Sequence, residues 1–476
     1  MPSPGEAWAE ITIMMKRIYF LFLVLTSCNS SKPPAPAMSV VVLGQDIDRT
    51  GSMATPSWAN SIRLAVSTAN AALKREGRAL RFEVAEANSG NSPEQARSEA
   101  LELVRQQGAK AIITDSSQDD IAVNALAYDG DPSHELGVPV VCIACTTPDI
   151  NNPEAQNVDP VKQAALRNLK GWNFRTTMSS VYQVPVLVRM LLASNRGDRF
   201  KLSIYASDDP YGRGFSDALK SGLLRARPAA LIEQVYHDVK VNPAEYDWAT
   251  DVAKVTDKHN ESTGKNDGPP DAVVEITFPK FAMGFTKAFL ASGSKVRLVH
   301  THNFRVARVL ETLKGVVEGQ EGTSQAVLGE GASAQVFAED LKALTGQLPA
   351  FRDSGAYDAA TTLMLAAMLA VQQNHLADSS QVTGAQIRDA MRGINAPDGE
   401  PVNAGMDGFA RALQLIAAGK KIDYQGASGP CDYDAHGDVV TQLARFQVRG
   451  GRFADLERFD CVRDASCPPV RTLGNR

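Results

Sequence analysis

The stretch LRFEVAEANSGNSPEQARSEALELVRQQGAKAIIT, residues 80–114, decides the fold class of this chain. Its beginning, 80–85, and its end, 111–114, have the apolar and β-branched composition of short strands. Between them, SPEQ at 92–95 supplies a serine N-cap, a first-turn proline and a capping-box glutamine, and Gly108 is typical of a helix C-terminus. The stretch therefore predicts a strand, a helix and a second strand, the repeating unit of a parallel sheet.

The same alternation continues on both sides of this unit. Further strands are expected at 40–43, 138–143, 200–205, 231–236, 272–277 and 295–300. Amphipathic helices are expected at 58–73, from 118, from 180 with Ser180 as the cap, and at 214–224, 244–259, 281–291, 357–371, 383–392 and 408–418. Strands around the glycine pair 450–451 follow in the C-terminal tail. The sequence thus predicts an α/β protein with two successive series of strands, the second beginning after Trp172.

Length and composition are those of an ordinary globular protein of two domains. The chain has 476 residues, of which 44% are hydrophobic and 22% charged, and its net charge is -5. Mild acidity without a basic patch gives no indication of a nucleic-acid partner. No apolar run after the N-terminal region is expected to cross a membrane.

The N-terminal region has the features of an export signal. A basic stretch at 15–17 precedes the apolar run 18–25, which is too short to span a bilayer, and Leu-Thr-Ser-Cys follows at 25–28. This pattern looks like a bacterial lipobox, although an apolar segment with a chance cysteine is the alternative. It predicts a signal peptide at 1–27, a lipid on Cys28, and a Ser- and Pro-rich tether at 28–39. We expect a lipid-anchored protein of the bacterial envelope that faces the periplasm.

Two predicted strand ends carry small hydroxylic residues. TDSS follows at 114–117 and ACTTP at 144–148. Parallel sheets bind ligands beyond the C-terminal ends of their strands, where backbone amides at helix N-termini suit an anion. Each loop alone is equally consistent with simple helix capping, but two such loops at successive strand ends favour a site.

Five cysteines remain besides Cys28. In an oxidising compartment we expect two disulfides and one thiol, with the connectivity left open. Cys142 and Cys145 have the spacing of a redox dithiol, but Cys142 lies in a predicted strand, whereas that chemistry needs a helix beginning at the first cysteine. A structural bridge or buried thiols are favoured.

Catalytic motifs are weak or missing in the sequence. The segment 426–430 is one residue short of a nucleophile elbow, and neither a zinc-protease helix motif nor a phosphate-binding Gly-Lys-Ser/Thr motif occurs. His300 and His302 at a strand end lack a carboxylate or cysteine at metal-ligand spacing and are interpreted as hinge or cleft residues. We therefore expect no enzyme, no catalytic residue, no cofactor and no metal.

A series of short motifs, taken in chain order, resembles the leucine/isoleucine/valine-binding family of type I periplasmic binding proteins. They are DRTG at 48–51, SS at 116–117, ACTTP at 144–148, FRT at 174–176, DPYGRG at 209–214, YDA at 357–359, YQGASG at 424–429 and YDAHGD at 433–438. The resemblance covers residues 40 to about 450 and implies two Rossmann-like lobes with flanking helices, joined by three hinge crossings near Trp172, His300 and Gly426. The implied lobes are 40–172 with 301–425, and 173–300 with 426–476.

The resemblance also implies roles for individual residues. Four positions match those that hold a ligand's carboxylate in similar amino-acid receptors: Ser116, Ser117, Ala144 and Thr146. Cys145 of the same loop is a further candidate, and Tyr211 matches an aromatic residue that packs over the ligand from the second lobe.

Two departures from the family pattern concern the rest of the ligand, one at the acid that pairs with an ammonium and one in the spacing between Gly51 and Asn70, which is two residues short. The acid expected to pair with an ammonium is matched by Ala282, so Glu275 is the only nearby substitute, and Trp58 is the candidate for the aromatic wall. Tyr357 and Asp358 are interpreted as structural residues at a helix start. We therefore lean toward an acid other than a standard branched-chain amino acid.

The resemblance implies a monomeric solute-binding lipoprotein that delivers a small polar solute, an amino acid or a related carboxylate, to an ABC permease. The alternative is an interaction or sensing lipoprotein on the same fold, similar to the activators of peptidoglycan synthases. A thiol oxidoreductase, resting on Cys142 and Cys145, is the third hypothesis.

Overall fold

Two mostly parallel sheets flanked by helices form the unit Ser39–Arg476. The computed structural model describes residues 38–126, 135–148, 150, 171–193, 195, 197, 199–257, 259–260, 265–266, 268–464 and 466–470. The predicted signal peptide, Cys28 and nearly all of the predicted tether lie outside the described residues.

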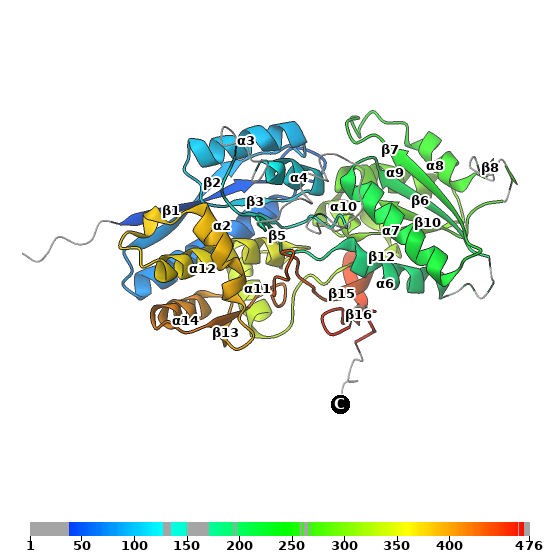
Figure 1. Ribbon diagram of the computed structural model, residues 1–476. Helices are drawn as coiled ribbons and strands as arrows, with labels where there is room; N and C mark the ends of the chain where they lie inside the picture. The colour runs from blue at the N-terminus through cyan, green and yellow to red at the C-terminus, as the bar shows by residue number, and fades with distance from the viewer. Residues whose placement is uncertain are drawn as a thin grey trace, which may run out of the picture. The chain divides into compact units, whose positions relative to one another are not determined.

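The first sheet has the strand order β2-β1-β3-β4-β5, and all of its pairs are parallel (Figure 1). Its strands are β1 (Ser39–Asp46), β2 (Leu80–Ala87), β3 (Ile112–Thr114), β4 (Val140–Cys142) and β5 (Asn173–Arg175). Because the strands are parallel, the loops after β3 and β4 leave the sheet at the same edge, as the sequence predicted.

The second sheet has the order β16-β15-β12-β11-β10-β6-β7, and only the pairs made by β15 are antiparallel. Its strands are β6 (Lys201–Ser207), β7 (Leu231–His237), β10 (Ala272–Ile276), β11 (Arg297–His300), β12 (Glu321–Gln325), β15 (Leu443–Arg449) and β16 (Arg452–Phe459). Two further pairs stand apart: β8 (His259–Asn260) with β9 (Lys265–Asn266), and β13 (Glu400–Asn403) with β14 (Ile422–Gln425).

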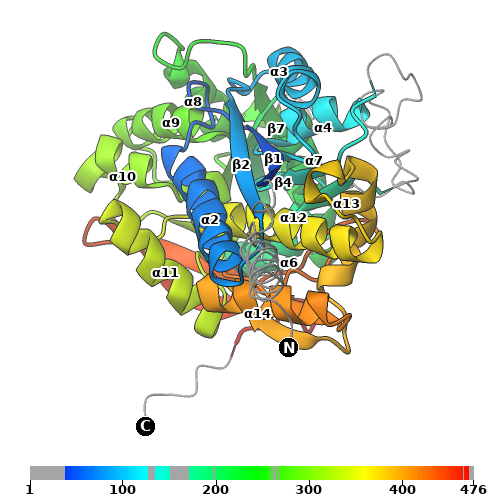
Figure 2. The same cartoon turned by 90° about the vertical axis from the view of Figure 1, so that its left-hand side faces the viewer.

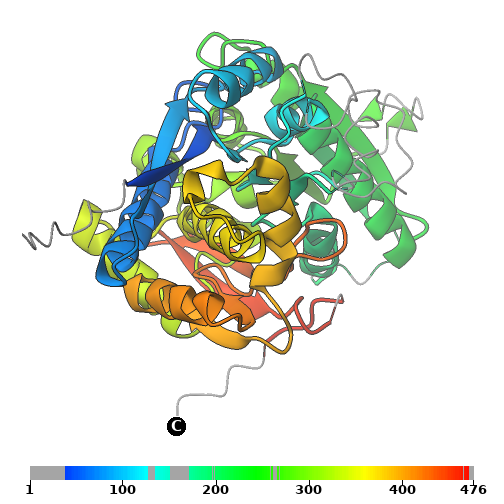
Figure 3. The ribbon, with the colours of Figure 1, turned by 60° about the vertical axis from the view of Figure 1, so that its left-hand side comes forward.

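Helices from both ends of the chain belong with the first sheet. They are α2 (Pro56–Arg75), α3 (Pro93–Arg105), α4 (Ser117–Ala125), α11 (Ala332–Thr345), α12 (Asp353–Gln373), α13 (Gly384–Ala390) and α14 (Met406–Ala417). The helix α2 lies along β2 (Figure 2), and α12 packs against α2, α13 and α14 (Figure 3). Contacts between segments this far apart make one core from both parts of the chain.

The second sheet has its own helices. They are α6 (Ser180–Leu192), α7 (Pro210–Ala226), α8 (Trp248–Thr256), α9 (Pro279–Ala291) and α10 (Ala307–Leu313). Single turns of 3-10 helix occur at η1 (His302–Phe304), η2 (Lys314–Val317), η3 (Ser379–Gln381) and η4 (Met391–Ile394).

Among the described helices, α12 is long and apolar enough to cross a membrane, contrary to the sequence-based expectation. Its most apolar stretch is 89% buried inside the protein. The apolar side chains of α12 are therefore those of a core helix, because α12 packs against α2, α13 and α14.

Three local expectations need correction. Ser92 is the N-cap of α3 but makes no side-chain capping bond, and the amide of Gln95 donates to the carbonyl of Asn88 at 2.5 Å, so the capping box is absent. Ser179, and not Ser180, caps α6. The strand β12 lies in the second sheet although 301–425 were expected in the first lobe, because it pairs with both β11 and β15.

Candidate functional site

The loop after β3 is tied to the loop after β4. The Ser116 hydroxyl accepts from the backbone N–H of Asp119 at 3.3 Å and so caps α4. The Ser117 hydroxyl accepts from the backbone N–H of Thr147, also at 3.3 Å. Both serines are buried: Ser116 caps α4, and Ser117 joins the two strand-end loops.

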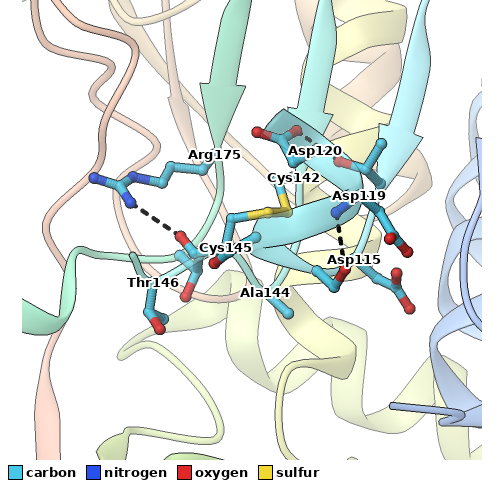
Figure 4. The surroundings of a disulfide bond; sticks show 12 residues. Asp115, Asp119, Asp120, Cys142, Ala144, Cys145, Thr146 and Arg175 are labelled. Carbon is cyan, nitrogen blue, oxygen red and sulfur yellow. Dashed lines mark hydrogen bonds between the residues drawn. A yellow bond between two sulfur atoms is a disulfide. The ribbon is translucent and has the colours of Figure 1, made fainter. Parts of the chain in front are cut away.

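A disulfide between Cys142 and Cys145 closes the loop after β4 (Figure 4). Arg175 holds the same loop from β5, because its Nη1 donates to the carbonyls of Cys145 and Thr147 at 3.0 and 2.9 Å. Both half-cystines are fully buried. Of the two interpretations favoured for this pair, the structure has a bridge and not two thiols, and the disulfide fixes the backbone that carries Ala144 and Thr146.

The remaining described cysteines also follow the prediction of two bridges and one thiol. Cys461 and Cys467 form the second disulfide, and Cys431 is a buried thiol. Asp120 lies close to both sulfurs of the first disulfide, but its two oxygens accept from Thr114 Oγ1 and Asn173 Nδ2 at 2.7 and 2.6 Å. Asp120 thus has a structural role in the described site.

Elements of the second sheet meet these loops through polar contacts. His302 Nε2, from η1, lies 3.3 Å from Thr146 Oγ1, and its Nδ1 lies 2.9 Å from Gln183 Oε1. Tyr211, from the first turn of α7, places its hydroxyl 3.3 Å from Thr301 Oγ1 and its ring 5.3 Å from that of His302. Burial, with Arg352 nearby, holds the pKa of His302 well below its usual range, so the ring is neutral at pH 7.

Arg352, just before α12, is the residue of this site that sequence reasoning missed. It is buried, and its Nη1 donates to the carbonyl of Ala144 at 2.8 Å. Its Nε and Nη2 have no acceptor among the residues that the structure describes. Burial lowers its pKa to about 9, which leaves it charged at pH 7. A charged residue at the start of an apolar helix was the signal that could have found it.

Buried acids lie on the other side of the strand-end loops. Asp115 Oδ2 accepts from the backbone N–H of Asp48 at 2.9 Å. Burial, followed by the charges of Asp48 and Asp119, raises the pKa of Asp115 well above its usual range. Asp48 in turn accepts from the backbone N–H groups of Thr50 and Met53 at 2.9 and 2.8 Å.

Two predicted site residues have structural contacts of their own. Glu275 Oε2, in β10, lies 2.5 Å from His300 Nδ1 and accepts from Thr286 Oγ1 at 3.3 Å. Trp58 donates from Nε1 to the carbonyl of Phe351 at 3.1 Å, which fixes the residue before Arg352. The structure thus brings Ser116, Ser117, Ala144, Cys145, Thr146 and Tyr211 into one region, and their roles toward a ligand remain predictions.

Comparison with known proteins agrees with this architecture. A family model described as "Periplasmic binding protein" matches residues 41–452. No curated protein sequence shows significant similarity to the chain.

Three solved structures share the fold. A leucine-binding protein from Thermotoga maritima is 15% identical, with 88% of this chain and 98% of that chain covered and a TM-score of 0.63. The branched-chain amino acid transporter substrate-binding protein of Streptococcus pneumoniae, solved with isoleucine, is 15% identical, with 87% of this chain and 97% of that chain covered and a TM-score of 0.61. An ABC transporter solute-binding protein of R. palustris, solved with benzoate, is 14% identical, with 90% of this chain and 97% of that chain covered and a TM-score of 0.63. At these identities the likeness shows the fold. Since the family model spans most of the sequence, the chain belongs to the periplasmic binding protein family and has its type I fold.

Proposed function

We propose that this protein is the solute receptor of an ABC importer and that it holds a small carboxylate between the strand-end loops of the first sheet and Tyr211 and His302. The observation that carries the proposal is the buried contact between Thr146 and His302, which joins the two sheets at the strand-end loops. Hydroxyls, a neutral imidazole and loop amides can satisfy an anion there without a metal.

Solutes of the structural neighbours are consistent with this class. The neighbours from Streptococcus pneumoniae and R. palustris were solved with isoleucine and benzoate, which are both small carboxylates. The roles of Ser116, Ser117, Ala144, Cys145 and Tyr211 at such a ligand remain part of the proposal, whereas Glu275 is already engaged by His300.

A ligand screen followed by calorimetry tests the proposal. The purified chain, stripped of ligand by unfolding and refolding, is screened by thermal shift with amino acids, keto-acids and aromatic carboxylates. For a ligand so found, Thr146→Ala should weaken binding by about 1 to 3 kcal/mol, or roughly five- to 150-fold, because a buried hydroxyl donor is lost. Thr345→Ala, a matched change in α11, should leave the affinity unchanged.

Two results would count against parts of the proposal, the first against the place of the site and the second against solute binding itself. Equal affinities of the Thr146→Ala chain and the wild type would remove Thr146 from the site. If no solute in the screen raised the melting temperature, the alternative of an interaction lipoprotein on the same fold would gain instead.

We further propose that the protein is held in the bacterial envelope by a lipid on Cys28 and works as a monomer facing the periplasm. Membership of the family supports the envelope location, and the lipobox-like sequence supports the anchor. Cells fed a palmitate analogue should label the wild type but not Cys28→Ala. Cys431→Ala, which changes the buried thiol, should label normally. Undiminished label on Cys28→Ala would refute the anchor.

A further inference from the structure

We infer that Arg352 binds the carboxylate of the solute through its Nε and Nη2 edge, and that the solute is an organic acid without an ammonium group. This inference rests on the proposed solute-binding function and names its substrate class. Arg352 is 4% exposed, and one of its three nitrogens, Nη1, is engaged by the Ala144 carbonyl at 2.8 Å. Its other two nitrogens have no acceptor within the described ranges. A buried cation left in this way is costly unless an anion from elsewhere pairs with it.

Arg175 shows how the same protein satisfies an arginine at the same loop. Its Nη1 also donates to carbonyls of the loop after β4, those of Cys145 and Thr147. Its Nε and Nη2 donate to the two carboxylate oxygens of Asp438 at 2.6 and 2.5 Å. Arg352 presents the same edge, but no described carboxylate is hydrogen-bonded to it. Because this edge matches a carboxylate in a two-bond geometry, the missing partner has the chemistry of the Asp438 side chain.

The backbone at Arg352 supports a functional role. Its φ is +67°, in the left-handed region that non-glycine residues adopt rarely because it is strained. Neighbouring contacts maintain this conformation, since Trp58 Nε1 donates to the Phe351 carbonyl and Asp353 Oδ2 accepts from the Ala350 N–H. Strained backbone conformations are concentrated at functional sites, where they are kept although they reduce stability. A buried, charged and strained residue is therefore expected in a binding site.

Aromatic rings lie beside the guanidinium. Its carbon lies 4.8 Å from the centre of the Phe351 ring, and that ring lies 6.3 Å from His302. The Tyr211 ring lies 5.3 Å from the same imidazole at a tilted angle. These rings offer an apolar surface for the body of an organic acid whose carboxylate reaches Arg352.

Two acids near the site are weak partners for an ammonium. Glu275 Oε2 is engaged by His300 and Thr286, and burial raises the pKa of this carboxyl, although its Oε1 has no donor among the described residues. Asp115 is close enough to Arg352 for its charge to raise the pKa of the guanidinium. Its Oδ1 has no donor among the described residues. Burial and the charges of Asp48 and Asp119 favour its protonated form. Ionising Asp115 against these effects costs free energy, so a zwitterion that needs this carboxylate should bind less tightly than the same acid without an ammonium.

The substrate class can be tested with pairs of ligands that differ in one group. Calorimetry with the refolded full chain compares 4-methyl-2-oxopentanoate with leucine, and benzoate with benzamide. We expect each carboxylate to bind, benzamide to bind undetectably, and leucine to bind at least roughly tenfold more weakly than its keto-acid. Tighter binding of leucine would overturn the absence of an ammonium, and Asp115→Asn should then abolish leucine binding. Binding of benzamide as tight as that of benzoate would overturn the carboxylate.

Variants of Arg352 test the residue itself. Arg352→Lys should weaken the carboxylate roughly 10- to 100-fold, because a point charge replaces a two-bond edge, and Arg352→Met should abolish binding. Arg352→Met should also keep or raise the melting temperature of the ligand-free chain, since it removes a buried cation without a full set of partners.

The outcomes separate the two proposals. Normal carboxylate affinity in Arg352→Met, with a lowered melting temperature, would mean that Arg352 is structural and would overturn the inference while leaving solute binding intact. Binding only of neutral or cationic solutes by the wild type would overturn the inference in the same way. A wild type that binds no solute at all would overturn the proposed function and the inference together.

Discussion

Asp46, at the C-terminal end of β1, shows how burial sets the chemistry of a single residue. Neither of its oxygens has a donor among the described residues, and the side chain is fully buried. Burial, followed by the charges of Asp119 and Glu99, raises the pKa of Asp46 from 3.8 to about 8. Burial is also the main reason why the pKa of Asp119 rises to about 7. At pH 7 Asp46 is therefore mainly protonated in the folded chain and ionised in the unfolded chain.

This shift predicts a loss of stability with rising pH. The folded state keeps the Asp46 proton up to about pH 8, whereas the unfolded state releases it near 3.8, so the unfolding free energy falls as the pH rises between these values. Asp46→Asn, which mimics the protonated form, should stabilise the chain by on the order of 1 to 3 kcal/mol at pH 8 and by almost nothing at pH 4.

Urea unfolding at a series of pH values measures the effect. Asp389→Asn, at an exposed position in α13, serves as the control and should not change the pH dependence. A gain of stability in Asp46→Asn that is as large at pH 4 as at pH 8 would contradict the raised pKa.

At the scale of elements, the start of α12 is bonded to the turn that follows β14. Asp358 accepts from the Tyr424 hydroxyl and the Ala427 N–H at 2.7 and 2.9 Å. It also accepts from the N–H and hydroxyl of Ser428 at 2.7 and 2.6 Å. A Cβ at Gly426 would come within 2.6 Å of Asp358 Oδ2, which explains the glycine of this turn. The interpretation of Asp358 as a structural residue is therefore supported by its contacts.

Loss of this carboxylate should be costly. Asp358→Ala leaves two hydroxyls and two backbone N–H groups without their acceptor, so we expect a loss of roughly 3 to 5 kcal/mol in unfolding free energy. Denaturant unfolding measures it, with Asp389→Ala as the exposed control in another helix. A loss below about 1 kcal/mol would show that water replaces the carboxylate in the turn.

At the scale of the whole unit, contacts between elements of the two sheets surround the strand-end loops. Lys280, at the start of α9, donates from Nζ to the carbonyl of Thr50 at 2.6 Å. Thr146 meets His302, and Arg175 of β5 pairs with Asp438, which precedes β15. These contacts join segments far apart in the sequence, and the proposed site lies where several of them converge.

Much of the fold follows from the sequence because its causes are local. The strand at 80–85, the helix on whose buried face Trp58 lies, and the hairpin around 450–451 were all predicted from periodicity and turn chemistry, and the structure has β2, α2 and the β15–β16 pair there. A strand or helix satisfies its backbone within a few residues or one neighbouring strand, and its apolar face repeats with a short period. Even so, the capping box at 92–95 failed, because the Gln95 amide found the Asn88 carbonyl instead.

What only the tertiary structure decided depends on residues distant in sequence. The sequence predicted strand-end loops with Ser116 and Thr146, but it could not show that His302 and Arg352 approach them from η1 and the start of α12. It also left the cysteine pairing open, and it expected β12 outside the sheet to which it belongs. Such contacts arise from packing between elements, where burial and the choice of partner depend on the whole fold and leave no periodic trace in the residues themselves.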